Sequence, residues 1–224
     1  TMKHLDAAGI RRAGAGRDPE EAARPALMEA RGERVALVAF TDNEPPFAAA
    51  GGKPGTNYLP VSTAPEVLRR VEAAIGTARE AGARTVIFSN HWGPNMVERP
   101  PERFRRFARA VIERGADVYY GHSAHVFQGV EVYRGKPILY DTGDFLDDYA
   151  VDERLRNDRS FLFRVSVEGG ELRRMELFPV SLSYAGVELA RGAERGEILA
   201  RMEFLSAELG TVLQHRADRL VIEL

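Results

Sequence analysis

Two stretches decide the fold of this chain: residues 85–93, Thr-Val-Ile-Phe-Ser-Asn-His-Trp-Gly, and residues 117–125, Asp-Val-Tyr-Tyr-Gly-His-Ser-Ala-His. Each stretch begins with a short apolar run, which is typical of a buried strand, and then reaches histidine. Open α/β sheets bind ligands at the edge where the carboxyl ends of the strands meet. Three of the five histidines of the chain fall in these two stretches. Because neutral imidazole is a common metal ligand, the pattern predicts a metal or anion site at this edge.

Strands and helices alternate around these two stretches. Residues 34–40 form another short apolar run. Apolar side chains at helical spacing predict one helix that ends at Gly82 and a second helix between Pro100 and Gly115. The order of strand, helix, strand, helix and strand over residues 34–120 implies parallel strands joined by right-handed crossovers.

The second half of the chain has a different pattern. Residues 161–167 and 171–180 alternate apolar and polar side chains on either side of Gly169-Gly170, which predicts a β-hairpin. Residues 194–209 have the spacing of an amphipathic helix, and residues 219–224 can add a strand.

Two short stretches carry helix-start signals. In Asp18-Pro19-Glu20-Glu21, Asp18 can cap the first turn, proline suits the first helical position and Glu21 can close a capping box. Thr63-Ala64-Pro65-Glu66 has the same pattern. Both stretches therefore predict a helix whose first N–H groups are bonded by side chains.

The composition is that of an ordinary globular protein. The 224 residues, 44% apolar and 29% charged, are enough for one domain with a sizeable core. A net charge of −2 provides no electrostatic case for binding nucleic acid. The chain has no cysteine, which excludes disulfides and thiolate metal sites. No apolar run approaches the roughly 20 residues that cross a bilayer, so we expect no membrane span in this chain.

Three aspartates follow predicted strands and are candidate site residues. Asp141 and Asp144 come after the strand predicted over residues 137–140. They can bind metal, orient a ligating histidine or cap a turn. Asp42 ends the strand over residues 34–40, and it either reaches the same edge or belongs to a solvated turn.

Polar residues on both sides of His91 are further candidates. Asn90 precedes this histidine and Asn95 follows it. Arg99 is a candidate for holding an anionic group, because a guanidinium matches the geometry of carboxylates and phosphates. A purely structural role is the alternative for each of them. His4 and His215 are expected on the surface, and no function is assigned to them.

The ordered motifs of the chain resemble those of a known family. They are Asn90-His91-Trp92-Gly93, Gly115-Ala116-Asp117-Val118, residues 121–133 and residues 135–145. This set is similar to that of the bacterial capsule synthesis protein CapA family, the poly-γ-glutamate capsule (PGA_cap) group, which is related to the calcineurin-like metallophosphoesterases. The likeness continues at residues 5–16 and 178–180, so it covers nearly the whole chain.

The resemblance implies an α/β fold, a metallophosphoesterase-like αββα sandwich, with a hydrolytic site for two divalent transition metal ions. His91 takes the place of the family's lone histidine ligand, and His122 and His125 take the place of its paired ligands. Imidazoles suit Mn, Fe or Zn. Both ions would polarise a phosphoryl-type group and lower the pKa of a bridging water. The residues that would support the ligands or contact the substrate are Asp141, Asp144, Asn90, Asn95 and Arg99.

The chain departs from the family pattern in three respects. Two residues separate His122 from His125, where metallophosphoesterases usually have one. Asp144 stands where many relatives carry asparagine, and Ser123-Ala124 stands where many carry His-Pro. The family's Gly-Asp and Asn-Asn-His motifs are expected before Met2. They would supply the bridging carboxylate and the general acid, so no catalytic residue is assigned in this chain.

We therefore expect residues 1–224 to be about the C-terminal two-thirds of a single CapA-type domain whose N-terminal strands are missing. The expected function is metal-dependent hydrolysis of a phosphate ester or related bond in capsule or poly-γ-glutamate biosynthesis. The alternative is a non-catalytic binding or scaffold subunit of a capsule-synthesis complex.

The expected partner of the chain is a small-molecule or polymer substrate, and a homodimer is a further alternative. The sequence leaves the compartment unknown. The cytoplasm is slightly favoured over an extracellular site reached through an anchor that precedes the chain.

Overall fold

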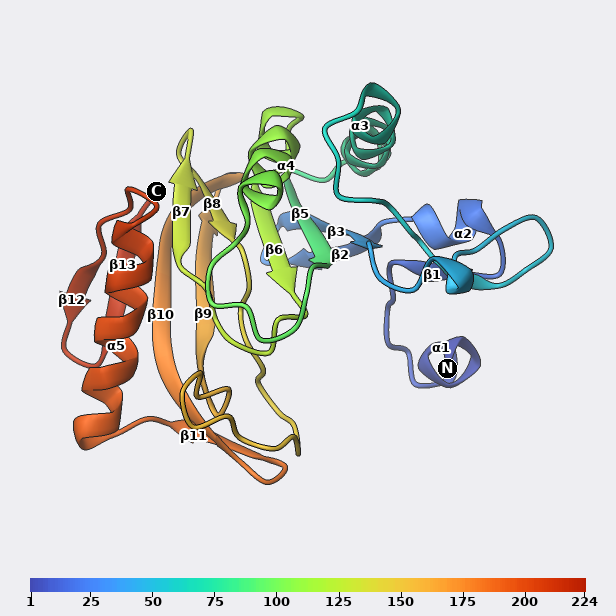
Figure 1. Ribbon diagram of the computed structural model, residues 1–224. Coiled ribbons are helices and arrows are strands. Elements are labelled where there is room, and N and C mark those ends of the chain that lie inside the picture. Colours follow the sequence, from blue (N-terminus) through green and yellow to red (C-terminus); the bar gives the residue numbers. More distant parts are fainter. The chain divides into compact units, whose positions relative to one another are not determined.

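Figure 1 shows the computed structural model of the chain, which describes residues 1–224 apart from the side chain of Ala30. The chain divides into two compact units, and each is described by itself. Unit 1 comprises Thr1–Gly93, Arg103–Tyr119 and Gly169–Glu171, and unit 2 comprises Pro94–Glu102, Tyr120–Glu168 and Leu172–Leu224. Among the described residues, no helix is both long and apolar enough to span a membrane.

A sheet with parallel and antiparallel pairs forms the centre of unit 1. Its strand order is β2 (Ala26–Ala30), β3 (Glu33–Thr41), β5 (Thr85–His91) and the start of β6 (Val118–His122). β2 is antiparallel to β3, whereas β3 is parallel to β5 with Thr41 opposite His91. The parallel pairing predicted for residues 34–40 and 85–89 is therefore confirmed, and the last residues of β3 and β5 lie side by side at one edge.

The helices of unit 1 bury the apolar faces that their spacing predicted. α3 (Pro65–Glu80) buries Val71 and Ile75, and α4 (Glu102–Glu113) buries Phe107. The Phe107 ring lies 6.4 Å from the ring of Phe88 on β5. Phe88 also stacks on Tyr119 of β6 at 5.5 Å. These aromatic contacts join α4 to the sheet.

The start of the chain forms small elements: α1 (Met2–Ala7), β1 (Ala15–Gly16), α2 (Pro19–Ala23), η1 (Pro45–Phe47) and β4 (Gly55–Thr56). The helix start predicted at Asp18 is confirmed, because its Oδ1 accepts a hydrogen bond of 2.8 Å from the N–H of Glu21. β1 pairs with β4. A Cβ on Gly16 would lie 2.2 Å from the backbone nitrogen of Ala22, so only glycine allows α2 to approach this closely.

The structure of unit 1 differs from the sequence prediction in three respects. α3 begins after Ala64, whose position has no side-chain cap, so Thr63 does not close a capping box. The N–H of Ala64 donates instead to Oγ of Ser62 at 3.1 Å. The strand β2 was not predicted. β5 extends beyond the predicted range 85–89, so that His91 is its last residue.

Unit 2 contains a mixed set of strands. In one sheet the order is β11 (Gly186–Leu189), β10 (Glu171–Ser183), β13 (Arg219–Glu223) and β12 (Gln214–Arg216), and β9 (Arg159–Glu168) pairs with β10. The predicted hairpin is confirmed, with positive φ at Gly169 and Gly170. The end of β6 lies next to β8 (Lys136–Leu139), which pairs with β7 (Val130–Tyr133).

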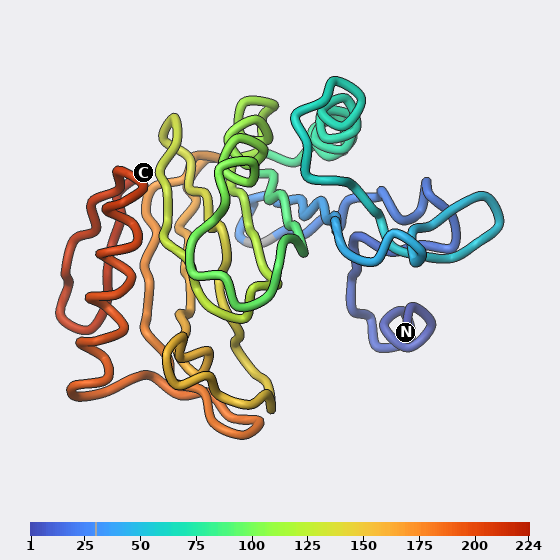
Figure 2. Tube along the Cα trace, in the orientation of Figure 1, coloured from blue at the N-terminus to red at the C-terminus, as the bar shows by residue number. Residues whose placement is uncertain are grey.

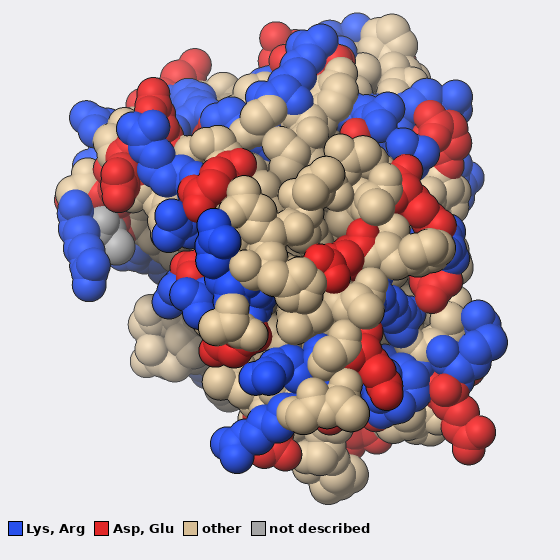
Figure 3. Space-filling model, turned by 90° about the vertical axis from the view of Figure 1, so that its left-hand side faces the viewer, with Lys and Arg blue, Asp and Glu red and all other residues tan. Residues whose placement is uncertain are grey.

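The helix α5 (Gly192–Ala207) completes the core of unit 2. Ile198 and Met202 are fully buried in one cluster with Met175, Leu177 and Leu220. Figure 2 traces the chain from α5 into β12 and β13. On the face that Figure 3 shows, acidic and basic side chains are interspersed. The mixed α/β class predicted from the sequence, with parallel and antiparallel sheets, is confirmed.

Candidate functional site

The edge of unit 1 brings Asp42 and His91 together. Thr41 and His91 are opposite each other in the parallel ladder. The N–H of Asp42 donates to the carbonyl oxygen of His91 at 3.2 Å, and the His91 side chain is exposed. Asp42 therefore reaches the predicted edge of the sheet, which was one of the two positions considered for it from the sequence.

The Asp42 carboxylate fastens the loop that follows His91. Its Oδ1 accepts a hydrogen bond of 3.0 Å from the N–H of Gly93. Burial raises the pKa of Asp42, and this effect exceeds the opposing influence of the Gly93 N–H and of the charges on Arg103 and His91. The hydrogen bond between Asp42 and Gly93 holds the end of β3 against the turn after β5.

Asn90 places a buried amide next to His91. Its Nδ2 donates to the hydroxyl oxygen of Tyr119 at 3.0 Å. Its Oδ1 is buried and accepts no hydrogen bond from the described residues. An unsatisfied buried acceptor costs about 1–3 kcal/mol. A carbonyl oxygen is a suitable ligand for Mn, so the Asn90 oxygen fits the chemistry of the predicted site.

Trp92 anchors the histidine loop to α4. Its ring lies 4.8 Å from the ring of Phe104 and 4.8 Å from that of Tyr119. Gly93 follows with a φ of 80°, a conformation that favours glycine. The start of α4 is therefore packed beside the residues that follow His91.

The loop after β6 in unit 2 carries His122 and His125 in an unusual conformation. His122 is the last residue of β6. Ser123 has a φ of 133° and His125 a φ of 62°. Positive φ is uncommon for residues other than glycine, and such strain often lies at functional sites. Contacts elsewhere hold the loop, since the N–H of Met96 donates to the carbonyl oxygen of Ala124 at 2.8 Å.

Asp141 is buried between two loops of unit 2. Its Oδ2 accepts a hydrogen bond of 2.8 Å from the N–H of Ala124, and its Oδ1 accepts one of 2.9 Å from the N–H of Gly143. Burial raises the pKa of Asp141 to about 6, against the lowering effect of these two N–H groups. Asp141 therefore ties the histidine loop to the loop that carries Asp144.

Asp144 contacts His125 directly. The Nδ1 atom of His125 lies 2.9 Å and 3.1 Å from the two carboxylate oxygens. Burial and the neighbouring carboxylate of Asp147 raise the pKa of Asp144, whereas His125 lowers it. A carboxylate on Nδ1 orients a metal-binding histidine and leaves Nε2 to face the ion. The pair thus has the arrangement of a ligand and its supporting group.

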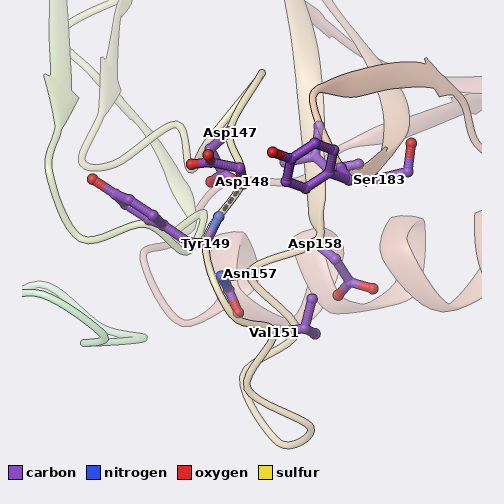
Figure 4. Close-up of a pocket in the computed structure, with 9 residues that line it drawn as sticks. Asp147, Asp148, Tyr149, Val151, Asn157, Asp158 and Ser183 are labelled. Carbon is purple, nitrogen blue, oxygen red and sulfur yellow. Dashed lines mark hydrogen bonds between the residues drawn. The ribbon is translucent and has the colours of Figure 1, made fainter.

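Two residues around this pair did not stand out in the sequence. The ring of Tyr149 meets the ring of His125 edge-on at 4.9 Å. Tyr149 and Asp147 also line a pocket of about 100 Å³ together with Asp148, Asn157 and Asp158 (Figure 4). Within it the N–H of Tyr149 donates to Asp147 at 3.4 Å. Their only sequence signal is a charged loop that closely follows Asp144.

Arg99 and Asn95 lie in the segment that leads to α4. Arg99 forms two hydrogen bonds with the carboxylate of Glu208, at 2.7 Å and 3.2 Å, and it also contacts Glu98. An anionic ligand would have to compete with these carboxylates. Asn95 is exposed. The proposed substrate contacts of both residues stay predictions.

The structure brings His125, Asp144 and Asp141 together in unit 2, and Asp42, Asn90 and His91 together in unit 1. No group of three or more histidine, aspartate or glutamate side chains within the described residues is arranged to hold a metal ion. The assignment of His91, His122 and His125 as a shared ligand set stays a prediction. The Asn90 oxygen and the His125–Asp144 pair are the features that fit it.

The fold and these residues define an α/β protein with histidines and carboxylates at the ends of its strands. Residues 1–149 match the family described as bacterial capsule synthesis protein PGA_cap. The chain therefore belongs to this family, as its motifs indicated.

Curated relatives support the same assignment. The chain is 30% identical over 231 residues to a probable polyglutamine synthesis accessory protein of Mycobacterium tuberculosis (strain H37Rv), with 99% of this chain and 60% of that protein covered. It is 30% identical to the capsule biosynthesis protein CapA of Bacillus anthracis, with 100% and 53% covered. The PGA biosynthesis protein CapA of Bacillus subtilis (strain 168) is 31% identical, with 70% of this chain and 39% of that protein covered.

The chain spans 60% of the length of the mycobacterial relative and 53% of that of the B. anthracis relative. A solved structure of a hypothetical protein from Thermus thermophilus aligns with 69% of this chain and 60% of that chain, at a TM-score of 0.45 and 13% identity.

Proposed function

We propose that this chain acts in capsule or poly-γ-glutamate biosynthesis as part of a metal-dependent hydrolase of a phosphate ester or a related bond. Membership of the PGA_cap family and the names of the relatives support the biosynthetic role. The observation that carries the metal-dependent chemistry is the contact of His125 Nδ1 with Asp144.

His91, His122 and His125 would hold the metal ions, which are expected to be two ions of Mn, Fe or Zn. Bound ions of this kind polarise the scissile group and supply a hydroxide nucleophile near neutral pH. Asp144 would orient His125. Asp141 would hold the loop of His122 and His125, and the general acid is not assigned within this chain.

Metal content tests this proposal. Purified protein loaded with Mn or Zn and then desalted is expected to retain near-stoichiometric metal by elemental analysis. His122→Ala and His125→Ala should remove most of it. Asp144→Ala should weaken metal binding by about 10- to 100-fold, because alanine leaves Nδ1 of His125 without its supporting partner.

Two variants serve as matched controls. His215→Ala removes a histidine that is 59% exposed and pairs with Glu203, and Asp148→Ala removes an exposed aspartate that follows Asp144 closely in the sequence. Both should retain the metal. Unchanged metal content in His122→Ala and His125→Ala would remove these residues as ligands. Wild-type protein with neither metal nor Mn-dependent phosphatase activity would instead favour the non-catalytic binding or scaffold subunit.

A further inference from the structure

Helix α4 carries several arginines next to the edge of unit 1. Between Glu102 and Glu113 the helix carries four arginines at positions 103, 105, 106 and 109. Its apolar side is buried, and the side chains of Arg103 and Arg106 are exposed. A guanidinium in this position can contact an anionic ligand.

Arg103 belongs to the first turn of α4, which lies beside the residues that follow His91. Its guanidinium lies 4.8 Å from the centre of the Phe104 ring, and that ring packs on Trp92. A Cβ on Gly93 would come within 3.1 Å of the same ring. These contacts place Arg103 next to the turn that Asp42 fastens.

The charge of Arg103 acts on this edge without being neutralised there. The Asp42 carboxylate at this edge accepts its hydrogen bond from the N–H of Gly93. Arg103 forms no ion pair among the described residues, whereas Arg99 pairs with Glu208 and Glu98. The contact with Phe104 restricts the Arg103 side chain, so less conformational entropy is lost when it binds a ligand.

We propose that Arg103 binds an anionic oxygen group of the substrate, a carboxylate or a phosphate, at the edge of unit 1 that carries Asp42 and His91. This inference rests on the proposed function, since it assigns a substrate contact to the same site. A guanidinium forms two parallel hydrogen bonds with either group. Glutamate polymers and phosphate esters both present such groups.

The test compares Arg103→Gln with the matched control Arg106→Gln. Arg106 is exposed, carries the same charge and lies three residues further along α4, about 4.5 Å from Arg103 along the helix axis. Calorimetric titration of the full chain with inorganic phosphate, and separately with a short γ-glutamyl oligomer, measures Kd without turnover. The ligand that binds more tightly identifies the source of the anionic group.

Arg103→Gln is expected to weaken that binding by roughly 10- to 100-fold, as the loss of a charge-assisted contact predicts. Arg103→Lys should recover only part of the affinity, because lysine keeps the charge but not the paired hydrogen bonds. Arg106→Gln should change Kd by less than about twofold, since an exposed charge that makes no direct contact with the ligand contributes little. Circular dichroism of each variant establishes whether it is folded. If Arg103→Gln does not fold, the Kd of Arg103→Lys is compared with that of wild type instead.

Three results would overturn the inference: no measurable binding to wild-type protein, an unchanged Kd in Arg103→Gln, or equal losses in Arg103→Gln and Arg106→Gln. Equal losses would mean that the helix attracts anions only through its overall charge. The titrations need neither metal nor hydrolysis. If ligand binding depends on Arg103 but the protein has no hydrolase activity, the proposed function is contradicted and the role of Arg103 in binding is not.

Discussion

At the scale of single residues, a contact between distant positions orients the side chain of His125. Its pairing with Asp144 joins residues 19 positions apart. His125 has a φ of 62°, a conformation that is uncommon for residues other than glycine. Two hydrogen bonds from backbone N–H groups to Asp141 hold the adjoining loops in place. The ligand candidate and its supporting carboxylates therefore depend on one another.

Glu21 offers a prediction about pH at this scale. Hydrogen bonds from the side chain and the backbone N–H of Arg17 lower its pKa from 4.5 to about 2. A folded-state pKa below the unfolded value stabilises the fold above the unfolded pKa, and this contribution is lost as the pH falls. The free energy of unfolding, measured in urea, should therefore decrease as the pH falls from 4.5 to about 2.

Glu21→Gln should be less stable than wild type at pH 6, and the difference should shrink as the pH approaches 2. The matched control is Glu20→Gln, since Glu20 is 88% exposed and lies 3.6 Å from its ion-pair partner, Arg24. Its stability should follow the wild-type curve. A constant difference between Glu21→Gln and wild type at every pH would contradict the prediction.

At the scale of elements, the packing of α5 depends on the glycine before β7. A Cβ on Gly129 would lie 2.4 Å from the backbone oxygen of Leu205, which cannot move without the helix. Gly129→Ala should therefore lower the free energy of unfolding by about 1–3 kcal/mol. Gly196 is also in α5, but a Cβ there would meet nothing within 4 Å.

Gly196→Ala should raise the free energy of unfolding by about 0.5–1 kcal/mol, because alanine loses less backbone entropy in a helix. Chemical denaturation of both variants measures the contrast. Equal effects of the two substitutions would mean that close packing at Gly129 does not hold α5 in place.

The starts of the helices and strands show which element boundaries can be predicted from a local sequence pattern. The start of α2 was predictable because the capping contact joins residues three apart. The capping box predicted at Thr63 was wrong, because the helix starts at Pro65 with Ala64 in the cap position. The sequence of β2, Ala-Leu-Met-Glu-Ala, consists of good helix formers. It becomes a strand only through its antiparallel pairing with β3.

At the scale of the whole molecule, the division into two units bears on the prediction of a single domain over residues 1–224, which stays a prediction. Met202 is fully buried in the core of unit 2. Met202→Ala should lower the free energy of unfolding by about 2–5 kcal/mol through the cavity it leaves. If the units unfold separately, hydrogen exchange should accelerate in β10 and β13 and remain unchanged in β3 and β5.

The matched variant is Val71→Ala in α3, where Val71 is fully buried in unit 1. Its effect on exchange should be confined to β3 and β5. Faster exchange throughout the chain in both variants would show that residues 1–224 unfold as one cooperative domain.

The sequence by itself determined the α/β class, most strands and helices, and the position of histidines and aspartates at strand ends. These properties follow from side-chain periodicity and from turns and caps within a few residues. Only the tertiary structure decided that Asp141 ties two loops together, that Glu208 neutralises Arg99 from 109 positions away, and that Asp42 accepts a hydrogen bond from Gly93. Such contacts join segments far apart in the chain, and no local pattern encodes them because packing and burial select the partners.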